Sequence, residues 1–182
     1  MKLFLKSIIP PIFFNISKKI LLTRYFNKNP GSWDDALKKS SSYDEEIIFK
    51  KTLNSARLVR DGHAIYERDS VIFDEIQYDW QLLASLMFIG NATKRLNVLD
   101  FGGALGTSYR QNKKFLDLIR IEKKWAIIDQ KKFIEIGKSE FEDDSLCFFE
   151  KISDINHEID VTLFGSSLCY LEKPYETLKD II

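Results

Sequence analysis

The chain of 182 residues is poor in cysteine and has no long apolar run. Its two cysteines, Cys147 and Cys169, lie in apolar, strand-like segments without metal-ligand spacing. They predict reduced core thiols in a cytoplasmic protein and disfavour a disulfide framework or a metal site. The uncharged run from Ser7 to Ser17 is far shorter than the roughly 20 residues that cross a bilayer, and Pro10-Pro11 interrupts it. The proline pair, with no small-x-small cleavage site after it, also disfavours a signal peptide.

The chain has no formal net charge, because 27 basic residues balance 27 acidic ones. Residues 1–33 hold six basic residues and no acid, so the remainder has 21 basic against 27 acidic residues, a net charge of −6. An acidic body argues against nucleic acid as a partner, since phosphate binding needs concentrated Lys and Arg. The 45% hydrophobic and 30% charged content is that of an ordinary globular protein.

Residues 1–30 form a basic amphipathic arm. Its apolar residues recur near helical spacing: Leu5, Ile8, Ile9, Ile12, Phe13, Ile16 and Ile20. Two interpretations stay open. The arm packs on the body of the protein or on another chain, or it lies as an interfacial helix on anionic lipid, which would give peripheral contact with the inner face of the membrane.

Residues 31–95 predict a helical preface. One helix runs from about Asp44 to Asp61, opened by a capping box at Ser42 and Glu45 and ended near Gly62. A second is opened by Asp74 and Glu75, stops at Gly90-Asn91, and carries one apolar face: Ile76, Trp80, Leu83, Ala84 and Met87. We expect this preface to cover the crevice of the domain that follows.

Residues 96–182 alternate between strand and helix patterns, which predicts an α/β fold with a parallel sheet and right-handed crossovers. The expected strands are 96–101, 125–129, 146–149 and 161–165. The expected helices are 107–120, 133–138 and one that begins near Lys173-Pro174.

A glycine-rich turn follows the first of these strands, within the run from Asn97 to Tyr109. Gly102, Gly103 and Gly106 would let the backbone turn sharply and approach a ligand closely, beside the free N–H groups of the next helix. The dinucleotide fingerprint fails here, because its second and third glycines would fall on Ala104 and Thr107.

Asp100 lies two residues before Gly102, and this pattern resembles D-x-G-x-G-x-G, the first motif of class I methyltransferases, with Ala104 at the middle glycine. The resemblance implies S-adenosylmethionine as the cofactor. Asp100 would then hold the turn or reach an ordered group near the methionine moiety. Asp129 would accept both ribose hydroxyls, or else cap a helix. The loop around Glu150-Lys151-Ile152 lies where adenine would rest. The alternative is a strand-to-helix turn without a ligand.

Other residues are candidates for contact with the molecule that accepts the methyl group. Ser166 and Tyr170 follow the fourth strand, beside the first, and are pocket candidates. Tyr78 and Trp80 suggest a sugar-stacking wall, although Trp80 also fits the core stripe of its helix. A general base would come from a short set of titratable residues, among which Glu75 is also a substrate candidate: His63, Asp69, Asp74 and Glu75. His157 is expected in solvent, and no catalytic residue is assigned.

Five segments extend the resemblance over nearly the whole chain: residues 31–33, 66–70, 73–78, 97–103 and 170–175. They resemble a family of methyltransferases encoded in bacterial surface-polysaccharide clusters. The resemblance implies a Rossmann-like class I methyltransferase fold and O-methylation of a sugar on a small molecule or glycan. Members usually have Glu-Gln where this chain has Asp129-Gln130, and they continue past the fourth strand. We therefore expect the C-terminal strands of a seven-stranded sheet to be missing here.

Two further hypotheses compete with a methyltransferase. The basic apolar arm and the missing strands would also suit an inactive scaffold or a membrane-associated partner in polysaccharide assembly. A nicotinamide-dependent sugar-modifying enzyme is a third possibility, which the glycine spacing disfavours.

Overall fold

The computed structural model describes residues 30–40 and 46–181. The chain divides into two compact units, residues 1–43 and 44–182. In the first, helix α3 (Trp33–Lys39) begins after Ser32, whose hydroxyl accepts from the Asp35 amide at 3.1 Å. Most of the predicted arm, residues 1–29, and the capping box of Ser42 and Glu45 lie outside the described residues.

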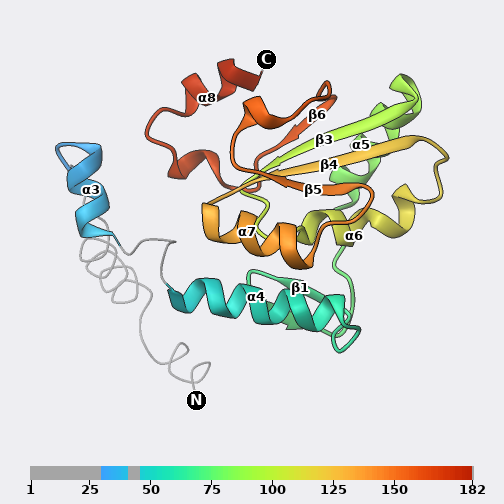
Figure 1. Cartoon of the computed structure of the whole chain (residues 1–182), viewed down its shortest axis with the longest axis horizontal. Coiled ribbons are helices and arrows are strands. Elements are labelled where there is room, and N and C mark those ends of the chain that lie inside the picture. Colours follow the sequence, from blue (N-terminus) through green and yellow to red (C-terminus); the bar gives the residue numbers. More distant parts are fainter. Residues whose placement is uncertain (1–29, 41–45, 182) are drawn as a thin grey trace, which may run out of the picture. The chain divides into compact units, whose positions relative to one another are not determined.

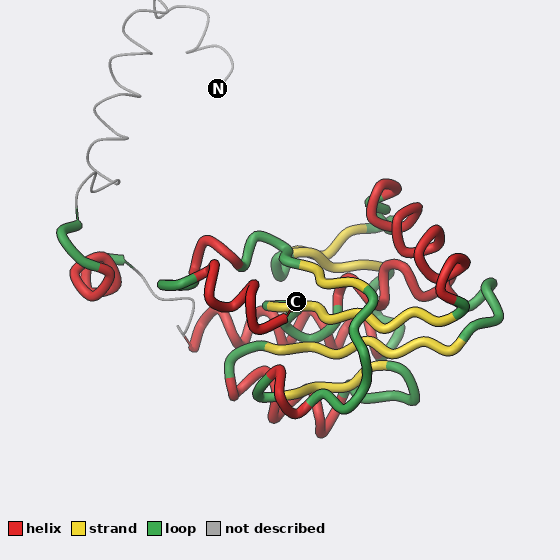
Figure 2. The backbone as a smooth tube through the Cα atoms, turned by 90° about the horizontal axis from the view of Figure 1, so that it is seen from above, coloured by secondary structure: helices red, strands yellow, loops and turns green. Residues whose placement is uncertain are grey.

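The second unit is built on a four-stranded parallel sheet, which confirms the α/β prediction. Its strands are β3 (Arg95–Phe101), β4 (Glu122–Ile128), β5 (Leu146–Phe149) and β6 (Val161–Leu163). They lie in the order β5-β4-β3-β6 (Figure 1), and Figure 2 shows the strands of the sheet, in yellow, side by side. The chain thus winds outward from β3 to β5 and then returns to the other side of β3. In doubly wound sheets, ligands bind outside the carboxyl ends of the strands at such a reversal, which here lies between β3 and β6.

Both faces of the sheet are apolar, because side chains of successive strand residues point to opposite faces. Val98, Trp125 and Ile127 belong to the larger core, which includes residues of α5 (Trp80–Thr93), α6 (Thr107–Leu116) and α7 (Lys131–Glu140). Leu99 and Ala126 lie in a second cluster that includes residues of η1 (Ile152–Asp154) and α8 (Pro174–Ile181).

The preface contains a hairpin that we did not predict. Helix α4 (Glu46–Arg60) leads into β1 (Tyr66–Arg68) and β2 (Val71–Phe73), which pair antiparallel. Asp69 and Ser70 form the two-residue turn, with φ of 51° and 66°. Positive φ at both positions is typical of a type I′ turn. In Figure 1, α4 and β1 lie on the side of α6 and α7 that faces away from the sheet.

Helix α5 differs from its prediction. It begins at Trp80, because the Asp79 carboxylate accepts from the Gln81 and Leu82 amides. Asp74 and Glu75 therefore lie before the helix and do not open it. The helix also continues through Gly90 to Thr93.

Three further features differ from their predictions: Gly90, Trp80 and the end of α6. Gly90 is no stop signal: a Cβ there would lie 2.7 Å from Cδ1 of Ile121, so the glycine permits close packing. Trp80 is 61% exposed, so its assignment to the core stripe was wrong. Helix α6 ends at Leu116, short of the predicted residue 120, and Ile119 lies close to the same glycine.

Candidate functional site

The glycine-rich turn joins β3 to α6 at the carboxyl edge of the sheet. Gly102 and Gly106 have φ of 79° and 88°, a backbone region that favours glycine. The Gly102 amide donates to the Ile128 carbonyl at 2.7 Å, which fixes the start of the turn to the end of β4. Gly106 is the N-cap of α6 and supplies no side-chain cap.

The chain's own side chains explain two of the three glycines. A Cβ on Gly103 would lie 2.6 Å from Cγ of Asp100, and a Cβ on Gly102 would lie 2.7 Å from Cβ of Ser167. Such separations do not occur without a shift of the neighbour. Glycine is therefore required at both positions by internal packing, whether or not a ligand approaches.

Asp100 lies beneath the turn and is 3% exposed. Its Oδ2 accepts from Nε1 of Trp125 at 3.2 Å. Burial raises the pKa of Asp100 to about 6, because the charged form loses its hydration; the hydrogen bond from Trp125 opposes this shift and the charge of Asp129 adds to it. The carboxylate is thus mostly ionised at neutral pH, with few groups to share its charge.

Asp129 follows β4 and contacts the same turn. Its Oδ2 accepts from the Ala104 amide at 2.8 Å, and its Oδ1 accepts from the Gln130 amide at 2.7 Å. Burial raises the pKa of Asp129, and these two backbone bonds partly oppose the rise. Each carboxylate oxygen can accept two hydrogen bonds and accepts one of these, so one position on each remains for a ligand hydroxyl.

After β6, the chain meets the turn through Ser167. Its hydroxyl donates to the Phe101 carbonyl at 2.6 Å. The predicted pocket residues beside it, Ser166 and Tyr170, are both exposed, and Ser166 has φ of 67°. Cys169 is exposed as well, so its assignment to the core was wrong. The sequence pointed to this loop through Ser166 and Tyr170, but the residue that contacts the end of β3 is Ser167.

Tyr78 and Trp80 do form an aromatic cluster, with Phe115. The centre of the Tyr78 ring is 5.0 Å from that of Trp80 and 5.1 Å from that of Phe115. Phe115 lies nine residues beyond Gly106, or about 13 Å along α6 at 1.5 Å per residue. The structure therefore places Tyr78 near the far end of α6 from the turn.

The candidate bases are dispersed. His63 follows α4, Asp69 lies in the hairpin turn, and Asp74 and Glu75 are exposed in the segment before α5. His157, expected in solvent, is instead partly buried, and its Nε2 is buried without a hydrogen bond. Burial lowers its pKa.

Beside the turn lies a cluster of polar side chains that the sequence did not predict, made by Glu67, Thr107 and Arg110. Glu67 of β1, 2% exposed, accepts from the hydroxyl of Thr107, the first residue of α6. Arg110 of α6 lies beside both and donates through Nη1 to the Leu105 carbonyl. The contacts of Glu67 with Thr107 and Arg110 join residues some 40 positions apart in the sequence, which only the unpredicted hairpin brings together.

Neither a metal cluster nor a membrane span is found in the part of the chain that the structure describes. No group of three or more His, Cys, Asp or Glu side chains there is placed to hold a metal ion. No helix of residues 30–40 and 46–181 is long and apolar enough to cross a bilayer. Comparisons of the chain with protein-family models, with curated proteins and with solved structures found no match.

Proposed function

We propose that the chain binds S-adenosylmethionine at the turn from Gly102 to Gly106 and acts as a methyltransferase of the Rossmann-like class I fold. The strand order supports this fold, because numbering the strands from β3 gives the order 3-2-1-4 of a doubly wound sheet. The sugar acceptor, and a role in surface-polysaccharide synthesis, rest on the sequence resemblance.

The negative charge beside the turn is the observation that carries the proposal. Asp100 and Asp129 both contact the turn, and their carboxylates lie in a largely dehydrated setting. Arg110 also contacts the turn, but it is paired with Glu67, so this pair adds no net charge. The charge of Asp100 directly beneath the turn disfavours the pyrophosphate of a dinucleotide there and favours the positive sulfonium of S-adenosylmethionine, which has no phosphate. Asp129, at the end of the second strand, suits the ribose of either ligand.

The residues of the chain then have defined roles. When bound, S-adenosylmethionine supplies an activated methyl group for transfer to a nucleophile. Asp129 accepts the ribose hydroxyls on its free lone pairs. Asp100 holds the turn from below and contributes negative potential. Ser167 joins the β6 loop to the end of β3, next to the crevice where an acceptor would approach.

Isothermal titration with S-adenosylhomocysteine tests the role of Asp129. The variant Asp129→Ala should bind about 10- to 150-fold more weakly, the loss expected for hydrogen bonds to a charged group. The matched control Asp144→Ala alters an exposed acid of the same unit and should bind as the unaltered chain does. Absence of saturable binding to the unaltered full-length chain would refute the proposal and favour a scaffold role.

A further inference from the structure

The turn and the start of α6 also contact two side chains that have no role in the proposed ligand contacts, Glu67 of β1 and Arg110 of α6. The last residue of the turn, Gly106, is the N-cap of α6 but has no side chain to satisfy the first N–H groups of the helix. Glu67 of the hairpin lies beside this helix start. Its carboxylate accepts from the Thr107 hydroxyl and lies by the positive end of the helix dipole.

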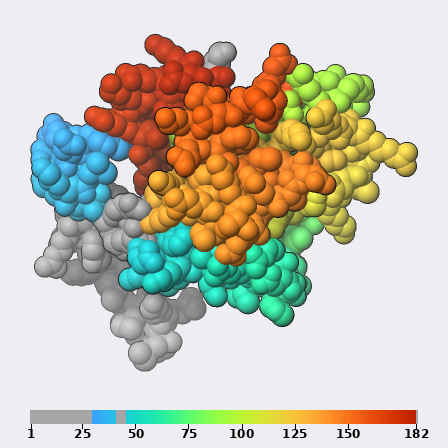
Figure 3. All heavy atoms as spheres, in the orientation of Figure 1, coloured from blue at the N-terminus to red at the C-terminus, as the bar shows by residue number. Residues whose placement is uncertain are grey.

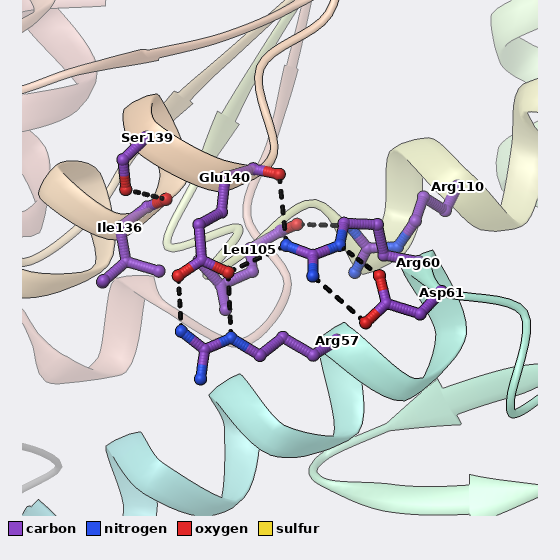
Figure 4. A network of polar contacts seen from close by, with 8 residues as sticks. All are labelled: Arg57, Arg60, Asp61, Leu105, Arg110, Ile136, Ser139 and Glu140. Atoms are coloured by element: carbon purple, nitrogen blue, oxygen red, sulfur yellow. Dashed lines mark hydrogen bonds and ion pairs between the residues drawn. The ribbon is translucent and has the colours of Figure 1, made fainter.

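Arg110 makes the second contact, with the backbone of the turn. Its Nη1 donates to the Leu105 carbonyl at 2.5 Å, and Leu105, inside the turn, is 1% exposed. Figure 4 shows this bond next to the ion pairs of α4 with α7. The Arg110 guanidinium also lies 5.5 Å from the centre of the Phe141 ring. It therefore anchors Leu105, next to the end of the turn, to the helix that follows.

Glu67 and Arg110 depend on one another. Nη2 of Arg110 lies 3.7 Å from Oε1 of Glu67 and has no hydrogen bond, although it is buried. Burial lowers the pKa of Arg110, and Glu67 counters that effect. A buried charge of this kind is stable only beside its partner, so loss of either residue disturbs the other and both contacts with the turn.

The cavity beside this pair is small. It is lined by residues of α4, the hairpin and α6, including Tyr66, Glu67 and Arg110. Its volume of about 40 Å³ admits about three water molecules, far less than the roughly 300 Å³ of a site for a nucleoside-sized ligand. Glu67 and Arg110 therefore act on a ligand through the turn.

We propose that Glu67 and Arg110 are positioning residues that hold the turn in its ligand-binding conformation, which makes the β1–β2 hairpin part of the binding machinery. The inference rests on the proposed function for the identity of the ligand. Coupling between sites is reciprocal. Ligand bound at the turn should therefore also slow hydrogen exchange at the hairpin amides.

Titration of Arg110 variants with S-adenosylhomocysteine tests the proposal. If Arg110→Met leaves the turn competent in one-tenth of the molecules, the apparent Kd rises tenfold. Arg110→Lys retains a donor for Leu105 and a charge for Glu67, and should recover most of the affinity. Arg120→Met removes an exposed arginine of the same unit and should change nothing. Binding by Arg110→Met equal to that of the unaltered chain would overturn the proposal.

A further measurement separates the possible failures. Hydrogen exchange at residues 103–107 without ligand should be faster in Arg110→Met. Unchanged exchange there refutes the proposal, even if the unaltered chain does not bind S-adenosylhomocysteine and the proposed function has failed. Should Arg110→Met not fold, Thr107→Val takes its place.

Discussion

The substitution Gly103→Ala tests whether Asp100 lies directly beneath the turn. Gly103 has an ordinary φ, so alanine meets no backbone strain there. Its Cβ, however, would lie 2.6 Å from Cγ and 2.7 Å from Oδ2 of Asp100, a buried side chain with little space to move. Overpacking costs about 1–3 kcal/mol. A further 1.5–3 kcal/mol is lost if the carboxylate leaves Nε1 of Trp125.

Urea denaturation at pH 7.5 should therefore show a loss of about 2.5–6 kcal/mol for Gly103→Ala. In a protein of this size such a loss lowers Tm by about 10 °C. The control is Gly165→Ala, because Gly165 also has an ordinary φ and a Cβ there would meet no atom within 4 Å. Its free energy of unfolding should stay the same or rise by less than about 1 kcal/mol.

A double-mutant cycle identifies the cause. In the Asp100→Ala background the clash is gone, so Gly103→Ala should cost less than about 1 kcal/mol. Equal stability of Gly103→Ala and Gly165→Ala would refute the geometry. A cost that persists in the Asp100→Ala background would assign the effect to some other contact.

Two electrostatic predictions concern stability and pH. Folding raises the pKa of Asp100 to about 6, so the folded state binds this proton more tightly than the unfolded state does. The free energy of unfolding therefore falls as the pH rises from about 4 to 6. Asp100→Asn should gain about 3 kcal/mol at pH 7.5 and nothing below pH 4 by urea denaturation; a gain independent of pH would contradict this. Arg57 and Arg60 of α4 lower the pKa of Glu140 to about 2, where α4 lies against α7 in Figure 3. Glu140→Gln should therefore lose about 1 kcal/mol in low salt, less as pH falls from 4.5 towards 2, whereas Glu46→Gln should lose almost nothing.

The sheet could be predicted because its signal is local. Each buried parallel strand reads as a short apolar run, so β5 was predicted at its observed bounds and β3 within one residue. The hairpin has no such signal: its strands have three residues each, and its turn uses Asp69-Ser70 in place of a glycine pair. The start of α5 was misplaced because Asp74, Glu75 and Asp79 are all plausible helix openers, and only hydrogen bonds distinguish them.

The candidate site was predictable in its backbone but not in its contacts. The glycines and the two strand-terminal acids are close in the sequence to the strands that place them, so Asp100 and Asp129 were found. Ser167 was not distinguished from Ser166, because side-chain direction in an irregular loop leaves no periodic pattern. Glu67 was assigned no role, since its partners are contributed by a helix 40 residues further along the chain.

Competition between S-adenosylmethionine and NAD⁺ for the full-length chain tests the central claim most directly. Both ligands contain an adenosine moiety, but one carries a sulfonium and the other a pyrophosphate. The negative charge of Asp100 beneath the turn predicts saturable binding of one S-adenosylmethionine per chain, with no displacement by millimolar NAD⁺. Tighter binding of NAD⁺, or no binding of S-adenosylmethionine, would contradict the account.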